Sequence, residues 1–255
     1  MAAPTVFLVT GANTGLGFEI ARALCRSNSR YEILLVARKD FPASLISISA
    51  VQLDITDDAF VAEAYRYISD KYNRLDVLIN DAGIQLVHEV GSGQMSLQEA
   101  WSTTYNINII RTHILTETFV RQHLKFTNSP FLFRTSGTSS LTEITEPKLS
   151  IDISPPVGWP KDHTTSLLGY RASKAALNIV VRDWCRLLKE DKVKVFDISP
   201  GFLATGLVVG MMEKSGAAHP SVGELVKDVV EGKTDDDETQ YNISSFAKNN
   251  SALKR

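Results

Sequence analysis

The segment from residue 5 to residue 17 constrains the fold of this chain more than any other. It starts with an apolar run, Val6 to Val9, which predicts a buried strand, and it continues into a stretch with the apolar spacing of a helix. Between the two lie Gly11, Gly15 and Gly17, at which the backbone can approach a ligand closely. Because the N–H groups of a helix N-terminus carry partial positive charge, we expect this turn to hold a phosphate group. The alternative is a glycine-rich turn that binds nothing.

The same alternation of strand and helix continues along the chain. Apolar runs predict strands at 31–37, 50–53, 75–79, 131–136 and 193–198, and helical spacing predicts helices at 57–68, 95–126, 167–188 and 221–231. Strands that read as continuous apolar runs are typical of parallel sheets covered on both faces. We therefore predict an α/β fold, a doubly wound parallel Rossmann sheet in three layers, α/β/α, with residues 1–255 forming a single domain.

Three segments depart from this regular pattern. Residues 38–49 join two predicted strands but are short for a crossover helix, so we expect an irregular connection there. Residues 141–166 contain prolines and show neither helical nor strand periodicity, which predicts an insertion. From about residue 232 the chain is acidic and polar, which predicts a polar C-terminal tail.

Composition argues against several classes of partner. The net charge of -2 gives no basic surface for nucleic acid or for an anionic membrane. No apolar run is long enough to span a bilayer, and the N-terminus lacks the pattern of a signal peptide, so we expect a cytoplasmic protein. The only cysteines, Cys25 and Cys185, form neither a disulfide framework nor a metal-binding motif, and we predict no metal site.

Polar residues and glycines follow the predicted strands. In doubly wound sheets, ligands bind beyond the carboxyl ends of the strands. The features at these ends are the glycine-rich turn, Arg38, Asp54, Asn80, Ser136 and Pro200-Gly201. Their common placement predicts a ligand site along this edge of the sheet.

Tyr170 and Lys174 lie one helical turn apart on the same predicted helix. A tyrosine has a pKa of about 10 and exchanges protons poorly at neutral pH, but a neighbouring cation favours the phenolate. Such a pair can exchange a proton with the oxygen of an alcohol or a ketone, and the hydroxyl of Ser136 can hydrogen-bond the same oxygen. The alternative is a surface tyrosine and lysine on an ordinary helix.

Taken in order, these motifs resemble those of the short-chain dehydrogenase/reductase family. The resemblance covers about residues 5–205 and rests on Thr10-Gly11-Ala-Asn-Thr-Gly15-Leu16-Gly17, Asn80-Asp81-Ala-Gly83, Tyr170-x-x-x-Lys174 and Pro200-Gly201-Phe-Leu203-Ala-Thr205. The ordered set is far more specific than any one of its members.

The resemblance implies four catalytic residues. Tyr170 would give its proton to a carbonyl oxygen, and Lys174 would lower the pKa of Tyr170 and hold the hydroxyls of the nicotinamide ribose. Ser136 would orient the carbonyl. Asn108 would hold a water relay behind the lysine, although a capped or solvent-facing helix asparagine is the alternative.

The resemblance also implies a nicotinamide cofactor. Its phosphates would lie on Gly11, Gly15 and Gly17, with a backbone contact from Leu16. Asp54 would bind the adenine amino group, and Asn80 would contribute from the motif after the fourth strand. Leu203 and Thr205 would contact the carboxamide.

Arg38 indicates which cofactor binds. An acidic residue after the second strand would favour NAD(H), whereas Arg38 and Lys39 offer hydrogen-bond donors to a 2′-phosphate. We therefore predict NADP(H). Two solvated basic residues in a loop are the alternative, and Thr14, where many NADP-dependent relatives carry a basic residue, gives the prediction no support.

Two charged residues depart from the family pattern. Asp81 replaces the second asparagine of Asn-Asn-Ala-Gly, and Arg134 lies inside the fifth predicted strand, on the face of Ser136. Because an unpaired buried charge is costly, we predict that Asp81 and Arg134 form an ion pair beneath the active site. If they meet, the guanidinium can also reach substrate.

The segment 141–166 separates Ser136 from Tyr170 by 34 positions and resembles the inserts of monomeric carbonyl reductases. It would cover a helix face that other members use to oligomerise, so we favour a monomer and keep an oligomer as the alternative. Trp159 is a candidate wall of the substrate pocket. The simpler interpretation is a decorated surface loop.

These observations predict an NADPH-dependent carbonyl reductase or alcohol dehydrogenase that acts on a small or medium organic carbonyl or alcohol substrate, in detoxification or specialised metabolism. The alternative is a repurposed family member that binds NADP(H) but acts as a cyclase, an isomerase or a non-catalytic binder.

Overall fold

The computed structural model describes residues 3–37, 48–125, 130–145, 150–161, 167–200, 221–232 and 240–244. Its strands are β1(Thr5–Val9), β2(Tyr31–Ala37), β3(Ile48–Gln52), β4(Val77–Asn80), β5(Phe131–Arg134), β6(Val195–Ser199) and β7(Gln240–Ser244). They form one sheet in the order β3-β2-β1-β4-β5-β6-β7, and all six neighbouring pairs are parallel. The strand order reverses between β1 and β4, which confirms the predicted doubly wound sheet.

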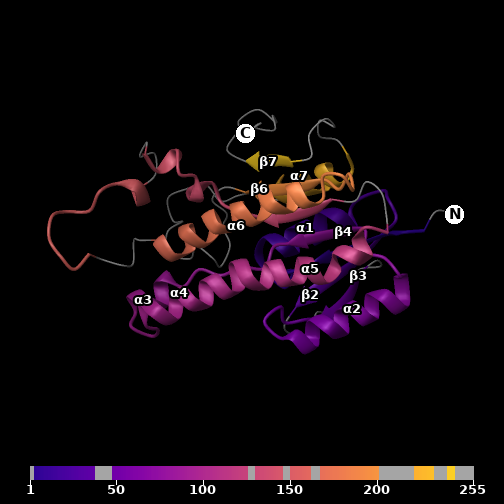
Figure 1. Cartoon of the computed structure of the whole chain (residues 1–255), viewed down its shortest axis with the longest axis horizontal. Coiled ribbons are helices and arrows are strands. Elements are labelled where there is room, and N and C mark those ends of the chain that lie inside the picture. The colour runs from indigo at the N-terminus through magenta and orange to yellow at the C-terminus, as the bar shows by residue number, and fades with distance from the viewer. Residues whose placement is uncertain are drawn as a thin grey trace.

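Helices cover both faces of this sheet. They are α1(Gly15–Cys25), α2(Asp58–Tyr72), α3(Val87–Gly91), α4(Leu97–Tyr105), α5(Thr112–His123), α6(Leu168–Leu187) and α7(Ser221–Val230). The buried side chains of α2, α5 and α6 form one apolar cluster with the sheet, and those of α1 and α7 form a second cluster. In Figure 1, α2, α5 and α6 lie side by side along one face. None of the helices in the described ranges is long and apolar enough to cross a membrane.

Local signals in the sequence explain the bounds of α2. Its N-cap is Asp57, whose carboxylate accepts a hydrogen bond from the N–H of Ala59 at 2.8 Å. It ends at Asn73, which adopts the left-handed conformation with φ of 55°. The buried positions between them are one helical face: Val61, Ala64 and Ile68.

Two elements differ from the sequence prediction. Residues predicted as one helix, 95–126, instead form α4, a π-helical turn η1(Asn106–Arg111) and α5 in direct succession. Strand β7 lies within the stretch predicted as a polar tail, and it pairs with β6. Polar composition alone does not predict this strand, because its neighbour in the sheet supplies the hydrogen bonds.

The predicted insertion adds short turns between β5 and α6. Its described parts include the 3-10 turns η3(Glu143–Thr145) and η4(Ser150–Asp152), and a further 3-10 turn, η2(Gly137–Ser139), precedes it. Arg171 anchors it to α6, because the guanidinium donates to the carboxylate of Asp152 and to the carbonyl oxygen of Thr138, both at 2.7 Å. The predicted irregular connection after β2 lies largely outside the described residues.

Candidate active site

The glycine-rich turn joins β1 to α1 at the carboxyl edge of the sheet. Gly11 and Gly15 have φ of +66° and +61°, a conformation that favours glycine. A Cβ added to Gly11 would lie 2.9 Å from the Cα of Ala82, and one added to Gly17 would lie 2.8 Å from the carbonyl oxygen of Gly11. The turn therefore packs its backbone against the segment that follows β4.

Thr10 fastens these two segments together. Its hydroxyl accepts hydrogen bonds from the N–H groups of Asp81 and Ala82, both at 3.0 Å. The neighbouring Asn80 is buried and donates from its amide to Thr116 of α5 at 3.2 Å. Asn80 thus links β4 to a helix, and its predicted cofactor contact stays a prediction.

A cavity of about 550 Å³ opens beside the turn, and we call it the rim cavity. Its lining includes Gly11, Gly15, Leu16, Asp54, Asp81, Gly83, Ile84, Gln85, Leu86 and Arg134. The predicted residues Gly11, Gly15, Leu16 and Asp54 therefore come together here. The carboxylate of Asp54 is held in place by Thr56, whose N–H and hydroxyl donate to it at 2.9 and 2.7 Å. Arg38, Leu203 and Thr205 lie outside the described residues.

Asn108 lies in the π-helical turn and is fully buried. Its amide oxygen accepts from the N–H of Ile84 at 2.8 Å, and its amide nitrogen donates to the carbonyl oxygen of Ile84 at 3.0 Å and to the hydroxyl of Ser173 at 2.9 Å. The alternative of a solvent-facing asparagine is therefore wrong. Asn108 connects the loop after β4 to α6.

Lys174 is buried beneath the same loop, with 1% of its surface exposed. Its ammonium donates to the carbonyl oxygen of Arg134 at 2.7 Å and lies 5.8 Å from the centroid of the Tyr170 ring. Burial, with the positive charge of Arg134, lowers the pKa of Lys174 well below its ordinary value. A Cβ at Gly83 would lie 2.9 Å from Nη2 of Arg134 and 3.5 Å from Nζ of Lys174, so these cations converge on the loop.

Tyr170 and Ser136 form a side-chain hydrogen bond, and burial and nearby charges shift the pKa of the phenol. Burial raises the pKa of Tyr170 above its ordinary value, while the charge of Arg134 and a hydrogen bond with Ser136 oppose this rise. Lys174 was predicted to supply the cation that lowers this pKa. The positive charge of Arg134 favours the phenolate, and the Lys174 ammonium lies 5.8 Å from the centroid of the Tyr170 ring while it donates to the backbone oxygen of Arg134. The role predicted for Lys174 stays a prediction.

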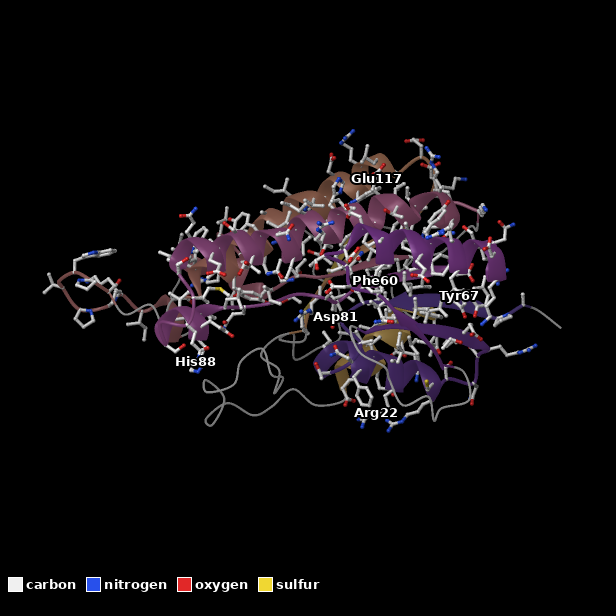
Figure 2. The ribbon with its side chains drawn as sticks, turned by 90° about the horizontal axis from the view of Figure 1, so that it is seen from below. Arg22, Phe60, Tyr67, Asp81, His88 and Glu117 are labelled. Atoms are coloured by element: carbon white, nitrogen blue, oxygen red, sulfur yellow. The ribbon has the colours of Figure 1, made fainter. Side chains whose placement is uncertain are left out.

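The predicted ion pair between Asp81 and Arg134 is confirmed. Nε of Arg134 lies 2.7 Å from Oδ1 of Asp81 and 3.0 Å from the backbone oxygen of Asp81. The side chain of Arg134 is 12% exposed and that of Asp81 is 6% exposed, and Figure 2 labels Asp81 near the middle of the view. Burial raises the pKa of Asp81 to about 6, although Arg134, Lys174 and the N–H of Gly17 all favour the carboxylate.

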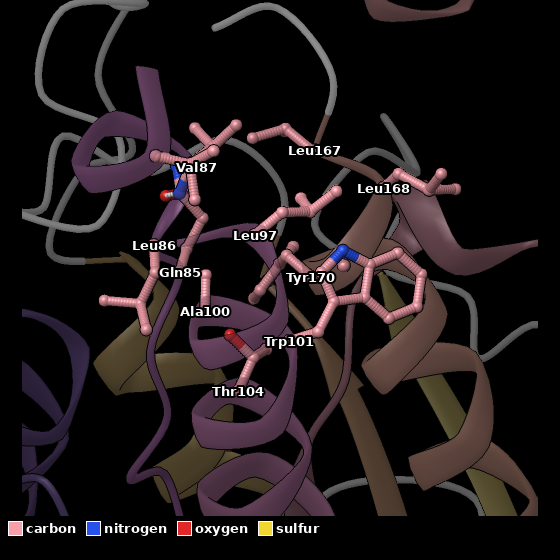
Figure 3. Close-up of a pocket in the computed structure, with 12 residues that line it drawn as sticks. Gln85, Leu86, Val87, Leu97, Ala100, Trp101, Thr104, Leu167, Leu168 and Tyr170 are labelled. Atoms are coloured by element: carbon pink, nitrogen blue, oxygen red, sulfur yellow. Dashed lines mark hydrogen bonds between the residues drawn. The ribbon is translucent and has the colours of Figure 1, made fainter. Parts of the chain in front are cut away.

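A second cavity of about 140 Å³ lies beside Tyr170, and we call it the α4–α6 pocket. This pocket lies between α4 and the start of α6 (Figure 3). Helix α4 contributes Leu97, Ala100, Trp101 and Thr104 to its lining. The Trp101 indole stacks on Tyr105 with ring centroids 5.9 Å apart. A Cβ at Gly169 would lie 3.3 Å from this indole, so the glycine leaves it room.

Trp159 does not line this pocket, contrary to the sequence prediction. Its side chain is 82% exposed in the insertion, whereas Trp101 supplies the aromatic wall. In the sequence, Trp101 lies within the stretch predicted as a helix, 95–126, and helical spacing alone does not separate a core position from a position that lines a pocket.

Comparison with known proteins decides the family. The sequence pattern described as short chain dehydrogenase matches residues 5–138, more than half of the chain. The chain belongs to the short-chain dehydrogenase/reductase family. It is 39% identical to the short-chain dehydrogenase/reductase eupG of a Phoma species, with 91% of each chain covered. It is 36% identical to tropE of Talaromyces stipitatus, covering 90% of this chain and 91% of that one.

Solved structures of this family share the fold. The NADPH-bound carbonyl reductase from chicken fatty liver superposes with a TM-score of 0.73 at 21% identity, covering 95% of this chain and 97% of that one. Family motifs identified Ser136, Tyr170 and Lys174 from the sequence. In the structure Ser136 hydrogen-bonds Tyr170, and the Lys174 ammonium lies 5.8 Å from the centroid of the Tyr170 ring. The motifs did not reveal that Thr10 hydrogen-bonds the segment after β4 or that Trp101 lines the α4–α6 pocket. Both contacts depend on residues that are distant in sequence.

Proposed function

We propose that this family member is an NADP(H)-dependent carbonyl reductase or alcohol dehydrogenase that acts on small or medium organic substrates. The observation that supports this most directly is that two cavities share part of their lining, and that one of them is lined by Tyr170. Gln85 and Leu86 line both the rim cavity and the α4–α6 pocket, and Tyr170 lines the pocket next to them. Ligands bound in the two cavities would therefore approach each other at Gln85 and Leu86, with the Tyr170 phenol in the lining of the α4–α6 pocket.

The rim cavity suits a nicotinamide dinucleotide. Its floor is backbone at Gly11 and Gly15, and it extends from the N-terminus of α1 to Asp54 after β3. The N–H groups of that terminus favour a diphosphate, and a carboxylate such as Asp54 can accept a hydrogen bond from an adenine amino group. Bound there, a reduced nicotinamide would supply the hydride.

Side chains of the protein itself would transfer the proton. In reduction, the Tyr170 hydroxyl gives its proton to the carbonyl oxygen, which becomes an alcohol once hydride reaches the carbon. The resulting phenolate is favoured by Arg134 and by the hydrogen bond with Ser136. Asn108 and Lys174 hold the loop and the strand end around this site.

The α4–α6 pocket supports an apolar substrate. Most of its lining is aliphatic or aromatic, with Thr104, Gln85 and the Trp101 nitrogen as its polar groups beside Tyr170. An apolar wall with few polar groups binds by excluding water and uses the polar groups for orientation.

The proposed preference for NADP(H) rests on Arg38 and Lys39, and the similar chicken liver carbonyl reductase is described as NADPH-bound. We expect Arg38→Glu to weaken NADPH binding more than NADH binding, because the new carboxylate repels a 2′-phosphate. Lys189→Glu, a charge reversal at an exposed position on the protein, is the matched control. Equal losses for the two cofactors would refute the assignment.

Turnover tests the proposal as a whole. Purified protein should oxidise NADPH in the presence of some members of a panel of apolar ketones and aldehydes. Tyr170→Phe should abolish turnover and leave NADPH affinity unchanged, because it removes one hydroxyl. Tyr105→Phe, which keeps the stacked ring on Trp101, should retain turnover. A protein that binds NADPH but turns over no carbonyl would favour the repurposed alternative.

A further inference from the structure

The carboxylate of Asp81 lies against the N-terminus of α1. It accepts a hydrogen bond from the N–H of Gly17, and a Cβ added to Gly17 would lie 2.9 Å from its Oδ2. Asp81 also lines the rim cavity together with Gly11 and Gly15. A negative side chain therefore stands beside the backbone groups that the proposed function assigns to a diphosphate.

This placement is unfavourable for an anionic ligand. Like charges repel, and the repulsion is stronger when one of them is buried, as the Asp81 carboxylate is, than when both lie in water. The carboxylate also takes up an N–H group at the positive end of α1. Without a positively charged partner, the Asp81 carboxylate would thus weaken the binding of any dinucleotide.

Arg134 removes this obstacle by direct contact. Its Nε lies 2.7 Å from Oδ1 of Asp81, and the same nitrogen donates to the backbone oxygen of Asp81 at 3.0 Å. Both side chains are almost completely buried, so solvent does little to screen the pair.

We propose that Arg134 is a positioning residue for the diphosphate, because its ion pair with Asp81 cancels a negative charge in the rim cavity and fixes the carboxylate to one side of it. This inference rests on the proposed function. The family motif has an uncharged asparagine at position 81. The ion pair of Asp81 with Arg134 stands in its place and also carries no net charge.

The other charged group facing Asp81 is Lys174 of α6, and Tyr170 faces Arg134 from the same helix. Lys174 is held by the backbone oxygen of residue 134, at 2.7 Å. A substitution of Arg134 keeps this backbone contact, so it tests the guanidinium alone.

The experiment measures the Kd for NADPH at about pH 6 and about pH 9.5, because the pKa of Asp81, about 6 beside Arg134, rises further when the guanidinium is removed. We expect Arg134→Met to weaken binding about tenfold or more at the higher pH. The loss should shrink at the lower pH, because the unpaired carboxyl takes up a proton. Arg134→Lys should retain most of the affinity at both pH values.

The double variant Asp81→Asn/Arg134→Met separates charge cancellation from a structural role. We expect it to bind NADPH within about threefold of the unmodified protein at both pH values, because it holds neither charge. A double variant as weak as Arg134→Met would overturn the inference, and so would a single variant with unchanged Kd. If Arg134→Met fails to fold, the Kd values of the double variant and of Arg134→Lys for NADPH still distinguish charge cancellation from a structural role. An unmodified protein without affinity for either nicotinamide dinucleotide would instead overturn the proposed function, and this inference with it.

Discussion

Asn108 and Ile84 are joined by two hydrogen bonds, one to each end of the asparagine amide. The amide oxygen accepts from the N–H of Ile84 at 2.8 Å, and the amide nitrogen donates to its carbonyl oxygen at 3.0 Å. The π-helical turn in which Asn108 lies aims this side chain at the loop after β4. A side chain of the long helix therefore sets the wall of the rim cavity, since Ile84 lines it.

We expect Asn108→Leu to destabilise the protein by about 2–4 kcal/mol, because a backbone N–H and a carbonyl oxygen at Ile84 lose their partner in a buried place. Urea unfolding measures this change. Asn106→Leu, in the same turn but only half-buried, is the matched control and should cost less. Equal costs for the two variants would mean that the Asn108 hydrogen bonds contribute little.

The pKa of Tyr170 predicts the pH dependence of turnover. Because burial raises this pKa, the phenol stays protonated through neutral pH, so kcat/KM for carbonyl reduction should fall only in alkaline solution. For alcohol oxidation, which needs the phenolate, kcat/KM should rise with pH. The hydrogen bond with Ser136 lowers the pKa, so Ser136→Ala should move both limbs to higher pH. A shift to lower pH in Ser136→Ala would contradict this assignment.

Trp101 and Gly169 should control the size of substrate that enters the α4–α6 pocket. Trp101→Ala removes the indole wall and should lower KM for bulkier apolar carbonyls relative to small ones. Gly169→Val places carbon atoms where even a Cβ lies 3.3 Å from the indole, and it should raise KM for all substrates. Steady-state kinetics over a size series measures both effects. Trp159→Ala, at an exposed position, should leave KM unchanged for small and for bulkier substrates. A changed KM in this variant would mean that Trp159 lines the substrate pocket.

We expect Asp76 to contribute to the free energy of unfolding and not to turnover. Its carboxylate accepts from the N–H of Val6 at 2.7 Å and from Arg74 at 3.1 Å, and it is buried. Asp76→Ala leaves the N–H of Val6, near the start of β1, without this acceptor, at a cost of about 1–3 kcal/mol. Asp70→Ala, at an exposed position of α2, should stay within about 0.5 kcal/mol. Comparable unfolding midpoints for the two variants would show that the Asp76 contact is weak.

The predictable part of this protein is the part encoded in neighbouring residues. Continuous apolar runs predicted β1 and β2, and the glycine spacing predicted the turn into α1, because backbone preferences and burial patterns repeat over a few positions. Asp81 and Arg134 were paired correctly because parallel neighbours place the ends of β4 and β5 together. Strand β7 was missed because its five residues gain their hydrogen bonds only from β6.

The sequence by itself determined the parallel sheet, the glycine turn and the family motifs, whose signals are local. Only the tertiary structure decided that Arg134 lies close enough for its charge to favour the Tyr170 phenolate, and that Trp101 and not Trp159 lines the α4–α6 pocket. The reason is physical. A charge acts through burial and distance, and a pocket wall is defined by what faces it, and both depend on residues brought together from separate parts of the chain.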